Sequence, residues 1–305
     1  MSFSFEAKNE LCRLPVQKLC CARAEAYGIL LYCNTFSASE VRIITGNPAL
    51  AARLPKLFHR AFGLRFDRLP EEGESGKLVF QITDGGKLRR IVDLLGFSPQ
   101  QNLALHINFG VLEEPCCRAA FLRGAFLAGG SVTDPRKGYH LELTTSHLSV
   151  GREMLALMRE VGLEPKAAQR KGNSVVYFKQ SDRIEDLLTS IGAPLSAMEV
   201  MNAKLEKDLR GSVNRRVNCD AANLDKAVEA AMTQVESIRR LEDQGRLALL
   251  PEKLQETASL RLAHPEDTLS QLAQRYDPPL PKSALNHRLR KLVELAKAEA
   301  ESPRR

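Results

Sequence analysis

An internal repeat, offset by 96 positions, constrains the fold of this chain more than any other feature. Residues 20–34 and 116–130 both begin with Cys-Cys and carry a glycine at the same place. The offset returns between residues 78–82 and 174–178, each an apolar stretch followed by a helical pattern that ends at glycine. Solenoid units are shorter, at roughly 20 to 50 residues, so this repeat indicates a duplicated domain.

The bulk composition is that of an ordinary globular protein. A length of 305 residues predicts two or three domains, and 44% hydrophobic with 27% charged residues can build a core. The net charge of +7 mildly favours a polyanionic partner. No apolar run approaches the roughly 20 residues of a membrane span, and a signal-peptide pattern is lacking. We therefore expect a cytoplasmic protein without a membrane partner.

Cysteine usage points to reduced side chains. The seven cysteines are an odd number, and none follows C-x-x-C spacing. This argues against a disulfide framework and against a zinc site. The adjacent pairs at 20–21 and 116–117 suggest redox chemistry, but their place on the repeated helix favours a packing role.

Helical and alternating periods predict the same order in both copies: helix, two strands, helix, two strands, helix. The clearest elements of the first copy are expected at 19–33, 40–45, 48–62, 77–83 and 87–95, and those of the second at 116–128, 139–145, 147–161, 174–179 and 182–191. The sequence therefore predicts an α+β fold of two αββαββα units, the first in residues 1–110 and the second in 111–212.

Small residues line the first helix of each copy, and include Gly28 and Gly124. Small side chains let two helices approach closely, so we expect these two to pack against each other at a pseudo-twofold centre. The alternative is two independent helices, each packed on its own sheet.

The segment 121–132, Phe-Leu-Arg-Gly-Ala-Phe-Leu-Ala-Gly-Gly-Ser-Val, resembles the motif helix of LAGLIDADG homing endonucleases. The resemblance implies paired central helices, two sheets forming a saddle over DNA, and an acid near each helix end that holds a divalent metal. Aligned on the central glycine, the acid positions fall on Cys33 and Gly129, neither of which offers a hard oxygen ligand. We expect no catalytic residue, no metal and no cofactor.

Two further features of the scaffold leave alternatives open. Asp134 lies five residues beyond Gly129, and the first copy offers only Glu40 further along, so a structure-specific metal-dependent nuclease remains the rival enzymatic reading. A set of basic residues could contact phosphates, or it could form a solvated surface without a function. The scaffold could instead dock proteins or sense a ligand. These candidate phosphate contacts are Arg136, Lys137 and Lys171, together with Arg215 and Arg216 nearer the C-terminus.

The C-terminal third predicts a helical domain at 223–305 after a linker at 213–222. Gly211-Ser212 is expected to break a preceding helix, and Asn223 to cap the next one. Three helices are then expected. The first spans 252–263, the second begins at a cap at Thr268, and the third spans 283–299 after a turn at 277–281. A short helix, a tight turn and a basic amphipathic helix are typical of helix-turn-helix domains.

The last helix carries the candidate DNA-reading residues. Residues 282–293 contain no acid, and asparagine and arginine can pair with adenine and guanine while other cations hold phosphates. A basic solvated helix without function is the alternative reading. The candidate DNA contacts are Thr268, Lys282, Ser283, Asn286, His287, Arg288, Arg290 and Lys291.

Three strings of the sequence resemble the WhiA family of bacterial regulators: residues 129–135, 216–226 and 286–292. The resemblance runs from about residue 3 to 300. It implies a degenerate homing-endonuclease scaffold joined to a helix-turn-helix domain. It also implies roles in sporulation-linked transcription or in cell division and chromosome segregation. The sequence departs from the family in the turn, where Pro278, Pro279 and Pro281 restrict the backbone.

We therefore predict a non-enzymatic transcription regulator that binds double-stranded DNA at promoter or nucleoid sites, with other transcription or division proteins as further candidate partners. The alternative from another class is a division-machinery adaptor whose DNA binding is incidental.

Overall fold

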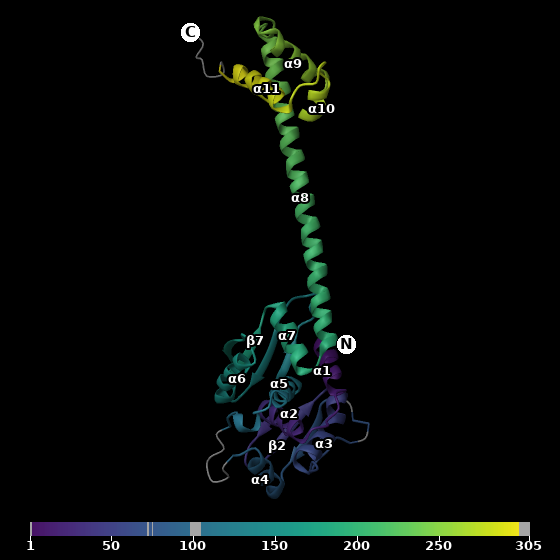
Figure 1. The fold of residues 1–305 in the computed structure, drawn as a ribbon, viewed down its shortest axis with the longest axis vertical. Helices are drawn as coiled ribbons and strands as arrows, with labels where there is room; N and C mark the ends of the chain where they lie inside the picture. The colour runs from purple at the N-terminus through teal and green to yellow at the C-terminus, as the bar shows by residue number, and fades with distance from the viewer. Residues whose placement is uncertain (1, 72, 75, 98–104, 299–305) are drawn as a thin grey trace. The chain divides into compact units, whose positions relative to one another are not determined.

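The computed structural model describes residues 2–71, 73–74, 76–97 and 105–298 of the chain (Figure 1). Its contacts divide the chain into two compact units, Met1–Asp208 and Leu209–Arg305. None of the helices in these described ranges combines the length and the apolar composition that a membrane span requires.

The first unit begins with α1 (Phe3–Cys12) and then contains both copies of the repeat. The first copy consists of α2 (Leu19–Tyr32), β1 (Thr35–Phe36), β2 (Val41–Thr45), α3 (Pro48–Phe62), β3 (Leu78–Ile82) and α4 (Gly85–Leu94). After a short 3₁₀ turn (Phe109–Val111), the second copy consists of α5 (Pro115–Gly129), β4 (Gly130–Val132), β5 (Leu141–Thr145), α6 (Leu148–Glu160), β6 (Lys166–Arg170), β7 (Asn173–Phe178) and α7 (Ser181–Ile191).

The predicted α+β fold and its duplication are confirmed, with one difference between the copies. The second copy has an antiparallel four-stranded sheet in the order β4-β5-β7-β6, whereas the first has three strands in the order β1-β2-β3. In place of a fourth strand, the described part of the first copy has a single bridge between Arg68 and Gln81. Pro70 follows two residues later and has no N–H to donate, which explains why the pairing stops there.

The two central helices, α2 and α5, pack against each other through their glycines. A Cβ built on Gly28 would lie 2.1 Å from the carbonyl oxygen of Phe121, and one on Gly124 would lie 2.0 Å from the carbonyl oxygen of Glu25. Backbone therefore touches backbone at the centre of the unit. The predicted helix pair is confirmed, and the alternative of two independent helices is wrong.

A buried ion group joins the helices around this centre. Glu25 is 2% exposed, and its carboxylate accepts hydrogen bonds from Arg53 Nε at 2.6 Å and from Arg123 Nε at 2.8 Å. Arg53 also donates to the carbonyls of Cys12 and Leu14, where α1 ends. Arg123 donates to the Ile191 carbonyl, where α7 ends. One carboxylate thus links α2, α3 and α5, and the arginines connect that centre to α1 and α7.

The second unit is helical. The chain passes through α8 (Pro194–Asp243), a 3₁₀ turn (Leu247–Leu249), α9 (Glu252–Ala263), α10 (Leu269–Gln274) and α11 (Lys282–Lys297). The helices predicted after residue 250 are confirmed within a residue or two, except that residue 299 lies outside the described residues.

The predicted break at Gly211-Ser212 is wrong, and so are the 213–222 linker as a non-helical segment and the cap at Asn223. One helix of 50 residues, α8, runs through all of them. A glycine in a helix costs only about 1 kcal/mol, and the following residues include no proline, so nothing local forces the helix to end. The other predicted domain limits remain predictions.

The core of the second unit forms where the end of α8 packs with α9, α10 and α11. Its apolar side chains include Ile238, Leu241, Leu272, Leu285, Leu289 and Leu292. Polar groups in this core are paired: Arg261 Nε lies 2.9 Å from Gln234 Oε1, and Tyr276 donates to Thr257 Oγ1 at 2.8 Å. Such satisfied buried pairs fix how the helices meet.

Candidate nucleic-acid interface

The helix α10 begins at a capping box. The Gln271 N–H donates to Thr268 Oγ1 at 3.3 Å, and the Thr268 N–H donates to Gln271 Oε1 at 2.9 Å. Arg275, just beyond the helix, pairs with Asp267 at 2.5 Å. The cap predicted at Thr268 is confirmed. Its contact with DNA remains a prediction, and its side chain is exposed at the start of the helix.

The proline-containing turn returns the chain to the core before α11 begins. The Leu280 N–H donates to the Ala273 carbonyl at 3.0 Å, which ties the turn to α10. Pro281 has φ −59° and stands immediately before the first residue of α11. Its ring therefore holds the angle that a helix start needs, without removing a helical hydrogen bond.

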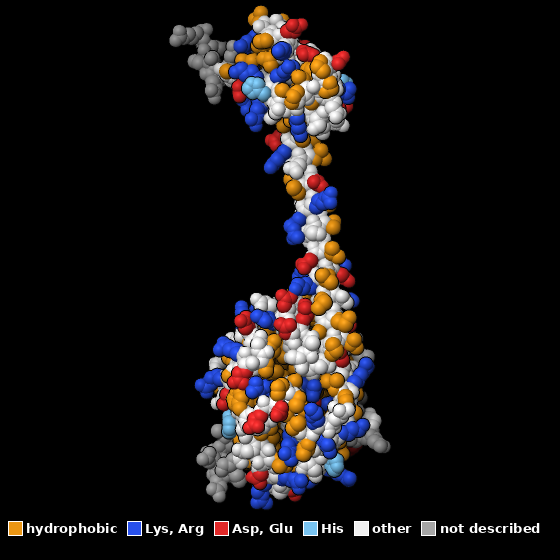
Figure 2. All heavy atoms as spheres, viewed as in Figure 1, with side chains coloured by type: hydrophobic (Ala, Val, Ile, Leu, Met, Phe, Trp, Pro, Cys, Tyr) orange, Lys and Arg blue, Asp and Glu red, His pale blue; other side chains and the backbone are white. Residues whose placement is uncertain are grey.

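The helix α11 has one apolar and one basic face. Leu285, Leu289, Leu292 and Ala296 are buried in the core of the second unit. Most of the predicted DNA contacts lie on the other side and are exposed, namely Lys282, Ser283, His287, Arg290 and Lys291. Figure 2 shows Lys and Arg side chains gathered over this helix.

Arg288 does not point outward as predicted. Its side chain is only 19% exposed, its Cζ lies 5.6 Å from the ring centroid of Tyr276, and its Nη1 lies 3.9 Å from Glu256 Oε2. Position 288 borders the buried stripe of the helix, and an aromatic face attracts a guanidinium there. The geometry thus favours a role in holding the turn against α9, and a DNA contact by Arg288 remains a prediction.

Asn286 and Arg290 also line a groove between α11 and α8. The groove has a volume of about 580 Å³ and includes Lys226, Thr233 and Lys297. Asn286 is half-buried at its edge, while Arg290 is exposed. These two side chains therefore lie on the flank of α11 nearer α8, next to the exposed basic face.

The ends of α2 and α5 carry no oxygen ligand in their side chains at the two positions where the homing-endonuclease resemblance implies an acid. The Cys33 thiol donates to the carbonyls of Leu30 and Thr35, and burial raises its pKa to about 12. At Gly129, a Cβ would lie 2.5 Å from the Thr144 carbonyl oxygen. The first position carries a protonated thiol, and the second has no space for any side chain.

The other acids weighed for cleavage are engaged locally. Asp134 Oδ1 accepts from the Arg136 N–H at 3.0 Å and so shapes a turn. Glu40 Oε1 accepts from Gln81 Nε2 at 3.0 Å. Each of these two carboxylates therefore has a local hydrogen-bond partner within its own copy of the repeat.

The basic residues proposed for the rest of the chain lie in exposed positions. Arg136 and Lys137 occupy the turn after β4, and Lys171 lies in the β6–β7 hairpin with φ 50°. Arg136 lines a hollow that also includes Glu6 and Glu199, which weakens its attraction for phosphate. Arg215 and Arg216 were predicted to lie in the 213–222 linker, but the structure places them on α8, where both are exposed. Their phosphate contacts remain predictions.

One cluster of potential ligands was not expected from the sequence. Cys20, Cys21, Cys116 and Cys117 come together at the start of α2 and α5, with their sulfur atoms within 4.8 Å of one another. The packing role predicted for these cysteines rested on their place on the repeated helix, and the lack of C-x-x-C spacing argued against a zinc site. The available signal was the same Cys-Cys pair at the same place in both copies, on two helices predicted to touch.

Comparison with known proteins relates both units to one family. Residues 213–296 match the family model of the WhiA C-terminal HTH domain, and residues 118–210 match that of the WhiA LAGLIDADG-like domain. A relative from Alkaliphilus oremlandii, "Probable cell division protein WhiA", is 37% identical over 310 residues and 97% of both chains. One of the same name from Clostridium novyi is 37% identical over 309 residues, 97% of this chain and 98% of its own. The crystal structure of full-length DUF199/WhiA from Thermatoga maritima has a TM-score of 0.59 and 23% identity, covers 98% of this chain and 99% of that one, and shares its fold.

Proposed function

This chain belongs to the WhiA family, and from that premise we propose that it is a non-enzymatic, DNA-binding regulator of bacterial cell division and chromosome segregation. The proposal rests on the exposed basic face of α11, where residues 282–293 carry no acid. The proposed partner is double-stranded DNA at promoter or nucleoid sites in the cytoplasm.

The chemistry of α11 supports this assignment of roles. A recognition helix contacts base edges from its N-terminal half and holds phosphates with flanking cations. Asn286 and Arg290 carry the donors suited to base edges, and Lys282, His287 and Lys291 surround them on the exposed side. The buried stripe of α11 and the capped α10 hold this face in a fixed position on the second unit.

The double substitution Arg290→Ala and Lys291→Ala is expected to weaken binding to a fluorescent mixed-sequence duplex by roughly 10- to 100-fold. The slope of log affinity against log salt is expected to fall by about 1 for each of the two side chains that neutralises a phosphate, because fewer counterions are then released from the DNA. Fluorescence anisotropy over a series of salt concentrations measures both. The matched control is Arg239→Ala with Arg240→Ala, an exposed pair on α8.

Unchanged affinity and slope in the α11 variant would remove the recognition-helix assignment. A larger loss in the α8 control would move the binding face away from α11. In cells, normal division with the α11 variant would favour the adaptor alternative, in which DNA binding is incidental.

The absence of catalysis is tested with supercoiled plasmid and Mg²⁺ or Mn²⁺. We expect no nicking beyond that seen with an Asp134→Ala variant, because neither Cys33 nor Gly129 offers an oxygen ligand for a hard cation. Agarose gels of the reaction over time give the rate. Cleavage by the original chain that disappears in Asp134→Ala would establish the nuclease alternative.

A further inference from the structure

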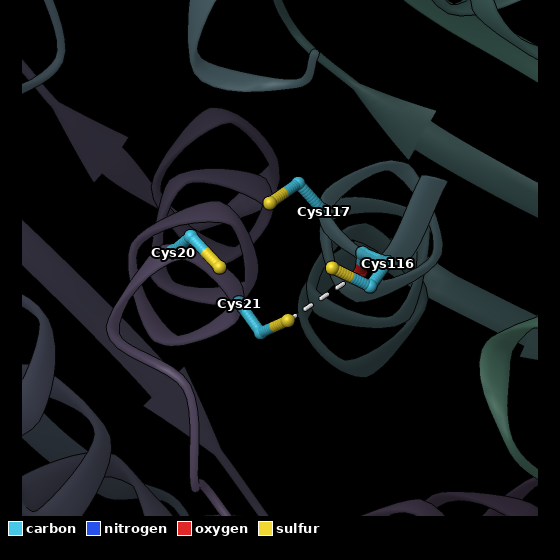
Figure 3. A group of neighbouring side chains, drawn as sticks. All are labelled: Cys20, Cys21, Cys116 and Cys117. Atoms are coloured by element: carbon cyan, nitrogen blue, oxygen red, sulfur yellow. Dashed lines mark hydrogen bonds between the residues drawn. The ribbon is translucent and has the colours of Figure 1, made fainter. Parts of the chain in front are cut away.

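The four clustered cysteines occupy equivalent places on the two copies of the repeat. Cys20 and Cys21 are the second and third residues of α2, and Cys116 and Cys117 are the second and third residues of α5. Figure 3 shows the four thiols directed into the space between the two helix ends. The Cys21 thiol also reaches across to the carbonyl oxygen of Cys116, at 3.7 Å.

We propose that these four thiolates bind one soft divalent metal ion, Zn²⁺ in the first place, in a tetrahedral site that joins the two copies. Four cysteine thiolates without a competing nitrogen or oxygen ligand select zinc among the abundant divalent ions. Each copy supplies two ligands, so the ion lies on the pseudo-twofold axis of the repeat.

The spacing of the sulfur atoms suits a single ion. Zinc–sulfur bonds of about 2.3 Å place the sulfur atoms of a tetrahedral site about 3.8 Å apart. In the structure, all four sulfur atoms already lie within 4.8 Å of one another. Binding one ion therefore requires the sulfur atoms to approach one another by about an ångström, a shift that side-chain rotation can supply.

Disulfides fit the same cluster less well. Adjacent cysteines have Cα atoms about 3.8 Å apart, shorter than the roughly 4.4 to 6.8 Å that a disulfide normally spans. Bonds within Cys20-Cys21 or within Cys116-Cys117 are therefore disfavoured. Two bonds between the helices would use all four thiols but need an oxidant, whereas one ion binds the thiols in the reduced state that the structure shows.

The surroundings allow entry of an ion. Burial raises the pKa of the Cys21 and Cys117 thiols, and a bound cation offsets this by deprotonating the thiols that coordinate it. Cys20 is exposed while Cys117 is buried, so one side of the cluster opens to solvent and the other is fixed by packing. This combination is typical of a structural site with a route for metal loading.

The test is the metal content of the full chain, purified under reducing, oxygen-free conditions without chelators. We expect about one zinc ion per chain by inductively coupled plasma mass spectrometry. We also expect a Co²⁺-loaded sample to show the visible absorption of a tetrahedral thiolate site. The variant Cys20→Ser with Cys116→Ser is expected to lose the zinc and to bind added Zn²⁺ more than about 100-fold more weakly. The control Cys12→Ser with Cys219→Ser removes two thiols outside the cluster and is expected to keep the zinc.

A second measurement uses the unaltered chain, so its outcome does not depend on whether a variant folds. Protein stripped of metal and shown to be helical by circular dichroism is titrated with Zn²⁺ against a coloured chelator. Tight binding of one ion with protection of four thiols from alkylation supports the site. No tight binding, equal loss of zinc in the control, or disulfides between α2 and α5 in the freshly purified chain would overturn it.

Discussion

Replacing Gly28 or Gly124 by alanine is expected to lower the free energy of unfolding of the first unit by about 3 kcal/mol, the upper end of the usual cost of over-packing. The new methyl group would lie 2.1 Å from the Phe121 carbonyl oxygen in the first case and 2.0 Å from the Glu25 carbonyl oxygen in the second. Because both obstacles are backbone atoms of a facing helix, no side-chain rotation relieves the clash, and α2 and α5 must separate.

Urea titration followed by circular dichroism measures this loss, and hydrogen exchange in α2 and α5 assigns it to the helix pair. The matched control is Gly138→Ala, where the added methyl group meets no atom within 4 Å. Equal stability of the Gly28→Ala and Gly138→Ala variants would contradict the close approach of the two helices.

The substitution Glu25→Gln is expected to destabilise the first unit by about 3 to 5 kcal/mol. Glutamine keeps the shape of glutamate but leaves the buried Arg53 and the partly buried Arg123 without their shared counter-charge. The matched control is Glu164→Gln, which removes an ion pair with Arg183 at 3.1 Å on an exposed residue and is expected to cost less than about 1 kcal/mol.

Thermal and urea unfolding of both variants compare the two costs. Replacing Glu25, Arg53 and Arg123 together by methionine is expected to recover part of the loss, since no unpaired charge is then buried. A Glu25→Gln chain as stable as Glu164→Gln would mean that water reaches the arginines.

Much of the scaffold could be predicted because its signals are local and occur twice. Glycines end the predicted helices at Gly63, Gly96 and Gly192, and all three adopt positive φ angles there. The pairing of α2 with α5 followed from small residues on both motif helices. The matching order of elements in the two copies let each copy support the interpretation of the other.

Two of the three features that the sequence did not predict depend on contacts between distant residues. Arg288 faces inward because the ring of Tyr276 lies beside it, and no helical period reveals that ring. The cysteine cluster needs two helices that start 96 positions apart to lie side by side. The helix α8 was divided in two because Gly211-Ser212 resembles a break, although the loss of propensity at two positions is small against the helix on either side.

The exposed middle of α8 has a consequence for cooperativity. Every residue from 212 to 225 is helical and exposed, and this stretch lies before the groove with α11, so it depends mainly on its own backbone hydrogen bonds. A helix without tertiary support is held only by its own modest propensity, and it frays locally on a submicrosecond timescale. Melting of one unit is therefore poorly transmitted through this stretch to the other, and heating should reveal two separate calorimetric transitions.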